Sequence, residues 1–426
     1  MVLMIKKLGK AILCMKLESQ VKRLRANNDF MIVAVGGSVG KTSTKLAIAK
    51  TLGASKKVIY QDGNYNDRLT VPLVLFGETE PAIFNIPAWI SLLRRTAKIS
   101  KQKFPYDAAV LELGTDAPGQ MEQFAYLKPD LYVLSSIAPE HMEYFGSLDA
   151  VATEELQPLS FAKHALINTD DSEAEYLAGR TFASYGFSDS ADYRITNTTQ
   201  RDFLGQRLTI ELASGQKIEA EVAALGKQGA KLVLAAAAAA HQIGIAPKDI
   251  VKGLQQITPV PGRMQILSGI KSSVLIDDTY NASPLAVKAA LDVLYNANMR
   301  QRIAILGTMN EMGEGSAHMH EEIGEYCDPT KLDVVVTIGD QAALYLAHAA
   351  AQKGCKVVSF LNPYEAGEWV KDNLKDKAVV LAKGSQNGVF AEEALKALLA
   401  RPADAKKLVR QSDYWMNVKK QQFPDS

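Results

Sequence analysis

The first half of the chain alternates short apolar runs with stretches of helical character. Residues 30–35 (FMIVAV) are apolar, suit a β-strand and end in glycines, and residues 46–52 behind them have helical character. Further apolar runs cover residues 108–113, 131–135 and 165–168, each ending at or near Gly, Pro, Asp or Asn. Strands that alternate with helices predict an α/β fold with a mostly parallel sheet.

Between residues 180 and 225 the pattern becomes an alternation of apolar and polar positions. Residues 193–196, 207–212 and 217–222 show it, with a Ser-Gly turn at 214–215, and predict a small antiparallel insertion. Residues 232–243 contain six consecutive alanines and predict a buried helix.

Turn residues then follow one another in Thr258-Pro-Val-Pro-Gly-Arg263, which predicts a domain boundary. Beyond it the alternation restarts, with apolar runs at residues 273–277, 302–306, 334–338, 356–360 and 378–382. We therefore expect three parts: an N-terminal helix over residues 1–29, a central domain over 30–260 and a Rossmann-like C-terminal domain over 261–426.

Composition places the chain among soluble globular proteins. Its 426 residues are 47% hydrophobic and 22% charged, and no apolar stretch reaches the 18 or more residues of a membrane span. A net charge of +1 gives no strong attraction to nucleic acid. The three cysteines have no metal-ligand spacing, which argues against a zinc site or disulfides and fits a reducing cytoplasm.

The N-terminal segment is more basic than the rest. Residues 1–5 and 11–15 are apolar, and no cleavage site of a secretory signal follows them. The bases around them are Lys6, Lys7, Lys10, Lys16, Lys22, Arg23 and Arg25. This pattern predicts a basic amphipathic helix, which either contacts an anionic membrane surface through residues 1–25 or docks on the first domain.

The strongest chemical signal is the glycine-rich run GGSVGKTS at residues 36–43, between a predicted strand and a predicted helix. Backbone N–H groups of such a loop and the N-terminus of the helix bind phosphate. Lys41 would reach the β- and γ-phosphates, and the Thr42 hydroxyl would ligate Mg²⁺. The predicted ligands are therefore ATP and Mg²⁺, bound by Gly37, Ser38, Val39, Gly40, Lys41, Thr42 and Ser43.

Glu112 ends an apolar strand at the sheet edge where α/β proteins bind ligands. Its carboxylate would hold Mg²⁺ beside the phosphates, and the alternative is a surface carboxylate at a strand end.

Several motifs together carry a family resemblance. The loop follows the AxxGxxGK[ST] pattern from Ala34, because Val35 stands where the commoner P-loop has glycine. The other motifs are Gly63-Asn-Tyr-Asn66, Leu111-Glu-Leu-Gly114, His141-Met-Glu-Tyr-Phe-Gly-Ser147, Asp277-Asp-Thr-Tyr-Asn281, Gly307 to Gly313 and Lys383-Gly-Ser385. In number, order and spacing they resemble the Mur ligase family, and within it the branch that adds D-alanyl-D-alanine.

The resemblance implies an ATP-dependent ligase that forms an amide bond through an acyl phosphate in peptidoglycan precursor synthesis. A UDP-muramyl-peptide-like acceptor and a D-Ala-D-Ala-like amine would be its substrates. Lys41, Glu112 and His141 would be catalytic, with His141 near a second metal. Arg263, Asp278 and Asn281 would contact the nucleotide, and Asn64, Asn66, Asn310, Lys383 and Ser385 the substrates. Each also has a structural alternative, such as turn formation by Asp and Asn.

Two departures from the family pattern matter. The loop begins at residue 36, which leaves no room before it for the domain that holds the uridine end of the acceptor. We expect a different mode of holding it, a partner chain that supplies the domain, or an acceptor without that end. Glu155 stands where the family carbamylates a lysine, so our hypothesis is that it supplies a catalytic, metal-binding carboxylate; the alternative is a solvated charge on a helix.

Two other functions stay open. One is a Mur-type ligase for another carboxylate and amine, because Thr308 and Gln386 depart from the family pattern where the amine is selected. The other is a regulator that binds ATP without ligating.

Overall fold

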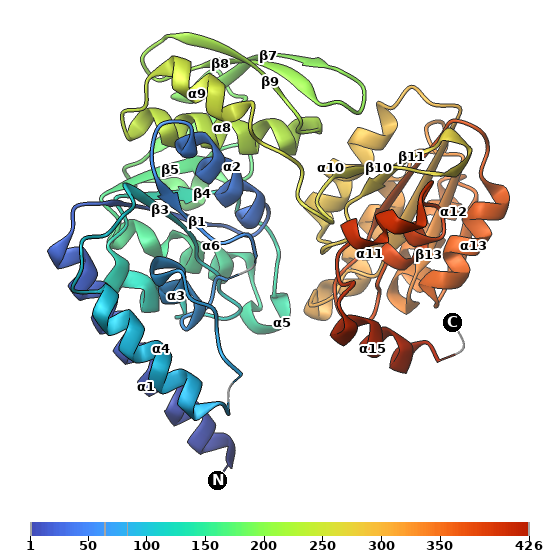
Figure 1. The fold of residues 1–426 in the computed structure, drawn as a ribbon. Coiled ribbons are helices and arrows are strands. Elements are labelled where there is room, and N and C mark those ends of the chain that lie inside the picture. Colours follow the sequence, from blue (N-terminus) through green and yellow to red (C-terminus); the bar gives the residue numbers. More distant parts are fainter. Residues whose placement is uncertain (1, 64, 83, 425–426) are drawn as a thin grey trace.

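The structure, a computed structural model, describes residues 2–63, 65–82 and 84–424. Two β-sheets organise it, one of nine strands and one of six, and each forms a unit with its helices (Figure 1). We call them the first and the second unit. No helix in these ranges is long and apolar enough to cross a membrane.

The first sheet is parallel from β2 to β7 and antiparallel from β7 to β9. Its strands in spatial order are β2 (Val58–Ile59), β3 (Ala108–Glu112), β1 (Met31–Gly36), β4 (Leu131–Leu134), β5 (His164–Asn168), β6 (Ala183–Gly186), β7 (Tyr193–Gln200), β8 (Gln206–Glu211) and β9 (Lys217–Val222). The predicted parallel sheet and antiparallel insertion are confirmed. The insertion continues the same sheet because β7 pairs with β6.

Helices cover both faces of this sheet. On one face lie α2 (Lys41–Gly53), α8 (Gly226–Gln242) and α9 (Pro247–Leu254). The opposite side carries α1 (Val2–Asn27), α3 (Thr70–Phe76), α4 (Ile86–Ile99), η1 (Met121–Leu127), α5 (Met142–Phe145), α6 (Leu148–Leu156), η2 (Gln157–Ser160) and α7 (Ala174–Leu177). The alanines at 235–240 in α8 are fully buried in the core that α8 shares with α2 and the sheet, which confirms the predicted buried helix.

Helix α1 docks on the first unit, which was one of the two alternatives expected for the N-terminal segment. Cys14 and Leu17 pack with residues of α3 and α4, while Val21 and Leu24 join the core below the sheet.

The second sheet is parallel except for its edge strand β10, which runs antiparallel to β11. Its order is β10 (Gln265–Ser268), β11 (Val274–Asp277), β15 (Ala378–Lys383), β12 (Gln301–Gly307), β13 (Val334–Ile338) and β14 (Val357–Phe360). The expected Rossmann-like arrangement is confirmed, whereas β10 was missed.

Helices again lie on both faces. One face carries α10 (Pro284–Tyr295), α11 (Ser316–Tyr326), η5 (Ala342–Leu346) and α12 (Ala347–Gln352). The other carries α13 (Pro363–Asn373) and α14 (Glu392–Lys396). Shorter turns η3 (Ile270–Ser272), η4 (Gly313–Gly315) and η6 (Pro402–Lys407) and the final helix α15 (Asp413–Gln422) complete the unit.

Candidate active site

The glycine-rich loop joins the end of β1 to the start of α2. Gly37 and Gly40 have φ angles of 116° and 87°, which side chains rarely adopt. A Cβ atom on Gly37 would lie 2.4 Å from Ser135 Oγ. Ser136 holds the loop through two hydrogen bonds, since Ser38 N donates to Ser136 O at 3.0 Å and Val39 N to Ser136 Oγ at 2.8 Å. The sequence therefore builds a narrow loop with the N-terminus of α2 behind it.

Lys41 begins α2 and forms an ion pair with Glu140, whose Oε1 lies 3.3 Å from Lys41 Nζ. Burial raises the pKa of Glu140 to about 8, although Lys41 opposes the rise. Burial alone would lower the pKa of Lys41, but Glu140 and other nearby carboxylates outweigh it and keep the ammonium charged. Sequence reasoning missed Glu140, although it directly precedes the predicted His141.

Thr42 lies where the two units meet. Its hydroxyl donates to Glu112 Oε1 at 3.1 Å and accepts from Arg263 Nη2 at 3.2 Å. The predicted Asn66 donates to the same Glu112 oxygen at 3.4 Å. Arg263 belongs to the connector that enters the second unit, so one hydroxyl contacts both units.

Glu112 is buried and has a second partner that the sequence did not reveal. Lys45, one turn beyond Lys41 on α2, places its Nζ 3.3 Å from Glu112 Oε2. Burial lowers the pKa of Lys45, and Glu112 opposes that change. The available signal for Lys45 was its spacing, because residues four apart, such as Lys41 and Lys45, lie on the same face of a helix.

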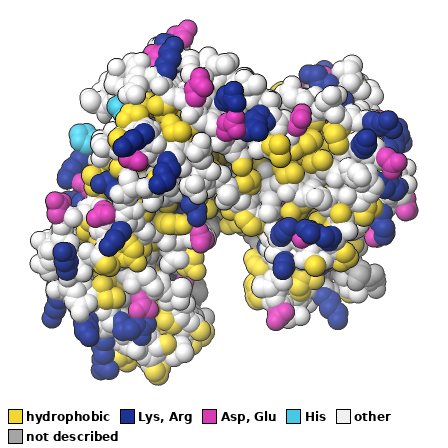
Figure 2. Space-filling model, turned by 45° about the horizontal axis from the view of Figure 1, so that its top comes forward, with side chains coloured by type: hydrophobic (Ala, Val, Ile, Leu, Met, Phe, Trp, Pro, Cys, Tyr) yellow, Lys and Arg dark blue, Asp and Glu magenta, His cyan; other side chains and the backbone are white. Residues whose placement is uncertain are grey.

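This part of the site fits a nucleoside triphosphate with Mg²⁺. Glu112 Oε2 is buried and makes no hydrogen bond to the described residues, although the Lys45 ammonium lies 3.3 Å away. The other oxygen of this carboxylate, Oε1, accepts from the Thr42 hydroxyl. Carboxylate and hydroxyl oxygens are ligands that Mg²⁺ prefers. A cleft of about 850 Å³ opens from the loop toward the second unit and has room for a nucleotide. Figure 2 shows a deep notch between the two units.

The second unit's side of the cleft is held together by its own polar contacts. The Arg263 guanidinium lies 4.1 Å from the ring centre of Tyr280, and Gly262 N donates to Asp277 Oδ2 at 3.1 Å. Lys383 Nζ donates to Asp278 Oδ2 at 2.6 Å and to Asn281 O at 2.9 Å. Asp278 and Lys383, which we predicted to bind different ligands, are thus hydrogen-bonded to each other.

Ser385 supports a neighbour and does not line the cleft. It is buried, and its Oγ accepts from Asn310 N at 2.9 Å. The Asn310 side chain in turn donates to the backbone of Gln386 at 2.7 Å. Of these two predicted substrate residues, Asn310 reaches the cleft and Ser385 lies behind it.

His141 bridges the two units. Its Nδ1 lies 2.6 Å from Glu311 Oε2 of the second unit, and its Nε2 lies 3.5 Å from Asp116 Oδ1 of the first. Within the described ranges, no three His, Cys, Asp or Glu side chains are grouped as a metal site. The metal role predicted for His141 therefore stays a prediction.

Glu155 lies underneath the loop. Its Oε2 accepts from Gly37 N at 2.6 Å, and Tyr132 OH donates to its backbone oxygen at 2.7 Å and to Oε2 at 3.3 Å. Burial raises the pKa of Glu155. The alternative of a solvated helix charge is wrong, because the residue is fully buried.

The cleft brings most of the predicted site residues together. Those that line it are Ser38, Val39, Gly40, Lys41, Thr42, Ser43, Asn66, Glu112, His141, Arg263, Asp278, Asn281, Asn310 and Lys383. Gly37, Glu155 and Ser385 are not among them, and Asn64 lies outside the described residues. Residues that sequence reasoning missed are Lys45, Glu140, Tyr280 and Glu311.

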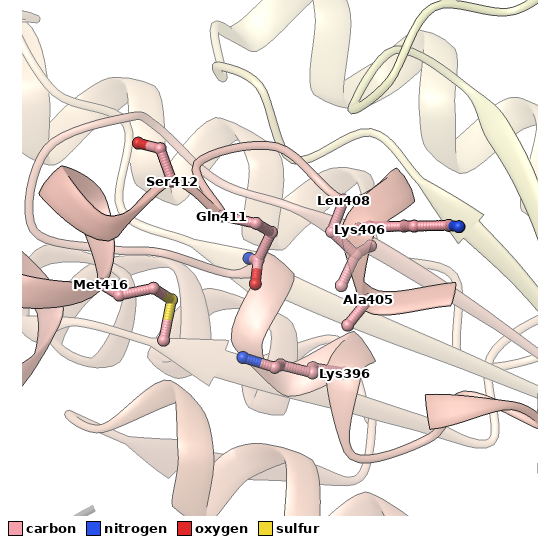
Figure 3. A pocket seen from close by; sticks show the side chains of 7 residues that line it. All are labelled: Lys396, Ala405, Lys406, Leu408, Gln411, Ser412 and Met416. Atoms are coloured by element: carbon pink, nitrogen blue, oxygen red, sulfur yellow. The ribbon is translucent and has the colours of Figure 1, made fainter. Parts of the chain in front are cut away.

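A separate hollow of about 540 Å³ lies on the second unit (Figure 3). Its lining residues are Lys396, Ala405, Lys406, Leu408, Gln411, Ser412 and Met416. None of the predicted site residues lines it, so the chemistry suggested by the sequence belongs to the cleft between the units.

Comparison with known proteins gives consistent matches. Residues 35–240 match the Mur ligase middle domain, and residues 262–386 match the Mur ligase glutamate ligase domain. The UDP-N-acetylmuramoyl-tripeptide–D-alanyl-D-alanine ligase of Haemophilus influenzae is 30% identical over 86% of this chain and 76% of its own length.

Solved structures share the fold. MurF from Acinetobacter baumannii superposes with a TM-score of 0.74 at 23% identity, covering 89% of this chain and 79% of that one. MurF ligase from Thermotoga maritima, in complex with ADP, gives a TM-score of 0.72 at 21% identity, covering 94% and 85%.

Proposed function

This chain belongs to the Mur ligase family and is a MurF-like, ATP-dependent amide ligase, and from that premise we propose that it adds D-alanyl-D-alanine to a UDP-muramyl-tripeptide. The named activity of the Haemophilus influenzae relative supports this choice of substrates. The observation that carries the proposal is the Thr42 hydroxyl, which contacts Glu112 of the first unit and Arg263 of the connector.

The proposed reaction has two steps. An oxygen of the acceptor carboxylate attacks the γ-phosphorus of ATP, the bond to the β-phosphate oxygen breaks, and an acyl phosphate and ADP result. The amine nitrogen then attacks the acyl carbon, a C–N bond forms, and phosphate leaves as the nitrogen loses a proton. Both steps move negative charge, which positive groups beside the phosphates stabilise.

Residues of this chain have suitable positions for each task. Lys41 and the backbone N–H groups of its loop would bind the phosphates, and Arg263 would bring a second cation when the units meet. Mg²⁺, held by Thr42 and Glu112, would supply neutralisation of phosphate charge. Asn310 would orient the amine from the second unit, on the opposite side of the cleft.

The test is ADP release by the purified protein with Mg-ATP, UDP-N-acetylmuramoyl-tripeptide and D-Ala-D-Ala, with mass spectrometry of the product. We expect release that requires both substrates, and a product heavier by the dipeptide less one water. Lys41→Met should lower the rate by about 10²-fold or more, whereas Lys57→Met, an exposed lysine of the same unit, should not.

Two results would contradict the proposal. ADP release with a different carboxylate or amine would keep the ligase chemistry and replace the substrates. ATP binding without ADP release, both with the proposed carboxylate and amine and with other carboxylates and amines, would support a regulator that does not ligate.

A further inference from the structure

Helices α1 and α4 lie side by side and run in the same direction. Gln20 Nε2 donates to Leu93 O at 3.1 Å, and Asn27 Nδ2 donates to Ser100 O at 3.3 Å. Both bonds join residues 73 positions apart, so the helices keep one register along their shared length. Figure 1 shows the two helices extending together below the first unit, at the end where the N-terminus is marked.

The leading end of this helix pair exposes large apolar side chains. They are Ile12 and Met15 of α1 with Phe84, Ile86 and Ile90 at the start of α4, and we call them the apolar tip. Among the described residues they make up half of the exposed large hydrophobic side chains, and Ile86 and Phe84 are 66% and 71% exposed. The register of the pair places Ile12 beside residue 85, so the tip is one patch. Such a cluster on one element pair is typical of a contact surface.

Basic side chains follow the tip along the same helix faces. They are Lys16, Lys22 and Arg23 of α1 with Arg94 and Lys98 of α4, and we call them the basic band. All five are exposed, and none forms an ion pair within the described part of the chain. Ile86, Ile90, Arg94 and Lys98 follow at intervals of four residues, which places them on one stripe of α4.

The charge of this surface is one-sided. Residues 9–27 and 86–103 contain ten Lys or Arg but only one acidic residue, Glu18, and Glu18 is paired with Arg68. The whole chain has a net charge of only +1. The positive excess is therefore local, and an opposite excess lies elsewhere on the molecule. Figure 2 shows Lys and Arg side chains gathered toward this end of the molecule.

We propose that the apolar tip and the basic band form a docking surface for an anionic lipid bilayer. At a membrane surface apolar side chains enter the boundary between headgroups and acyl chains, while Lys and Arg lie against the phosphates. The order of tip and band along the two helices matches that change of environment with depth. A nucleic acid would use the basic band but would leave the apolar tip in water.

The surface leaves the cleft accessible, because the cleft lies between the units and no described side chain of α1 or α4 lines it. Docking would hold the ligase at a membrane with its site open to the solution. This inference is independent of the proposed substrates.

The test is co-sedimentation of the full chain with vesicles of phosphatidylcholine, with and without phosphatidylglycerol. We expect binding only with the anionic lipid, and loss of binding at high salt. The double variants Ile86→Ser with Ile90→Ser and Arg94→Glu with Lys98→Glu should each weaken binding by about tenfold or more. Leu361→Ser and Lys420→Glu, exposed positions of the second unit, are the matched controls.

Thermal unfolding and ATP binding of each variant show whether it is folded, since neither helix lines the nucleotide cleft. Equal binding to neutral and anionic vesicles would overturn the proposal, as would no binding at all. Retention by duplex DNA without vesicle binding would assign the surface to nucleic acid and overturn it as well.

Discussion

The carboxylate of Glu155 accepts a hydrogen bond of 2.6 Å from the backbone N–H of Gly37. A buried carboxyl group thus holds the glycine-rich loop from beneath, and its other oxygen, Oε1, has no hydrogen-bond partner among the described residues. The loop would bind phosphate on one side, and on the other it is hydrogen-bonded to a buried carboxyl group. A negative charge this close to the nucleotide site would also favour a cation there.

Glu155→Gln tests that charge. The amide keeps an oxygen for Gly37, so the loop should keep its place, while the negative charge is lost. We expect the Mg²⁺ concentration at half-maximal activity to rise about tenfold. The measurement is ADP release against Mg²⁺ concentration. Glu154→Gln, which changes a buried neighbour bonded to the 119–121 segment, is the control, and an unchanged Mg²⁺ response of Glu155→Gln would sink the metal hypothesis.

Arg263→Ala tests the contact between the units. It removes both the hydrogen bond to Thr42 and the stacking on Tyr280, so kcat/KM for ATP should fall by about 10²-fold. Arg263→Lys should also have a lower kcat/KM for ATP, because an ammonium group neither stacks on Tyr280 in the same way nor offers a planar fork of donors. Steady-state kinetics check this, with the exposed Arg300→Ala as control. Full activity of Arg263→Lys would contradict the assigned role.

Asp277 predicts a pH dependence of stability. Burial raises the pKa of this carboxyl from 3.8 to about 6, although Thr279 opposes the rise. The folded state then binds a proton that the unfolded state has already released, so the stabilisation is complete below about pH 4 and is lost as the pH rises through about 6. A shift of this size corresponds to about 3 kcal/mol.

The measurement for Asp277 is denaturant unfolding between these pH values. The free energy of unfolding of the parent should fall between about pH 4 and pH 6 relative to that of Asp277→Asn, because the variant lacks the titrating carboxyl group. Asp376→Asn, at an exposed position, should show the same pH dependence of stability as the parent. Parallel pH profiles of the parent and Asp277→Asn would show that the raised pKa has no share in stability.

Gly253→Ala tests the close approach of α9 to α2. A Cβ atom there would lie 2.4 Å from Thr51 O, a backbone atom that cannot move aside easily. We expect a loss of about 1–3 kcal/mol in the free energy of unfolding. Gly53→Ala is the matched control in a helix, because nothing lies within 4 Å of its added Cβ, and it should gain up to about 1 kcal/mol. Equal stabilities of the two variants would refute this packing account.

The apolar runs predicted most strands because strands such as β3, β4 and β13 are buried on both faces. Runs such as 334–338 fall on β13 residue for residue. Three strands were missed, the two-residue β2, the four-residue β6 and the edge strand β10, since a short or half-exposed strand needs no continuous apolar run. Local alternation predicted β7 to β9 but not their attachment to β6, which depends on pairing between distant segments.

Site residues divide in the same way. Lys41, Thr42 and Glu112 were predictable because a loop pattern and a strand end fix their place. Lys45 and Glu140 were not, because ion pairing across the fold leaves no local pattern. For Glu155 the position followed from its spacing after the His141 motif in the family resemblance, whereas its contact with Gly37 required the fold.

The alanines at 235–240 decide where this protein tolerates mutation. They lie in the core that α8 shares with α2 and the sheet, and a methyl group has no rotamer that could absorb a displacement of a neighbouring element. A bulkier residue on the side of α8 that faces α2 would displace α2, and with it Lys41 and Thr42. A screen for altered substrate choice would therefore do better to leave this stretch constant and to vary the second unit, where Asn310 and Lys383 lie.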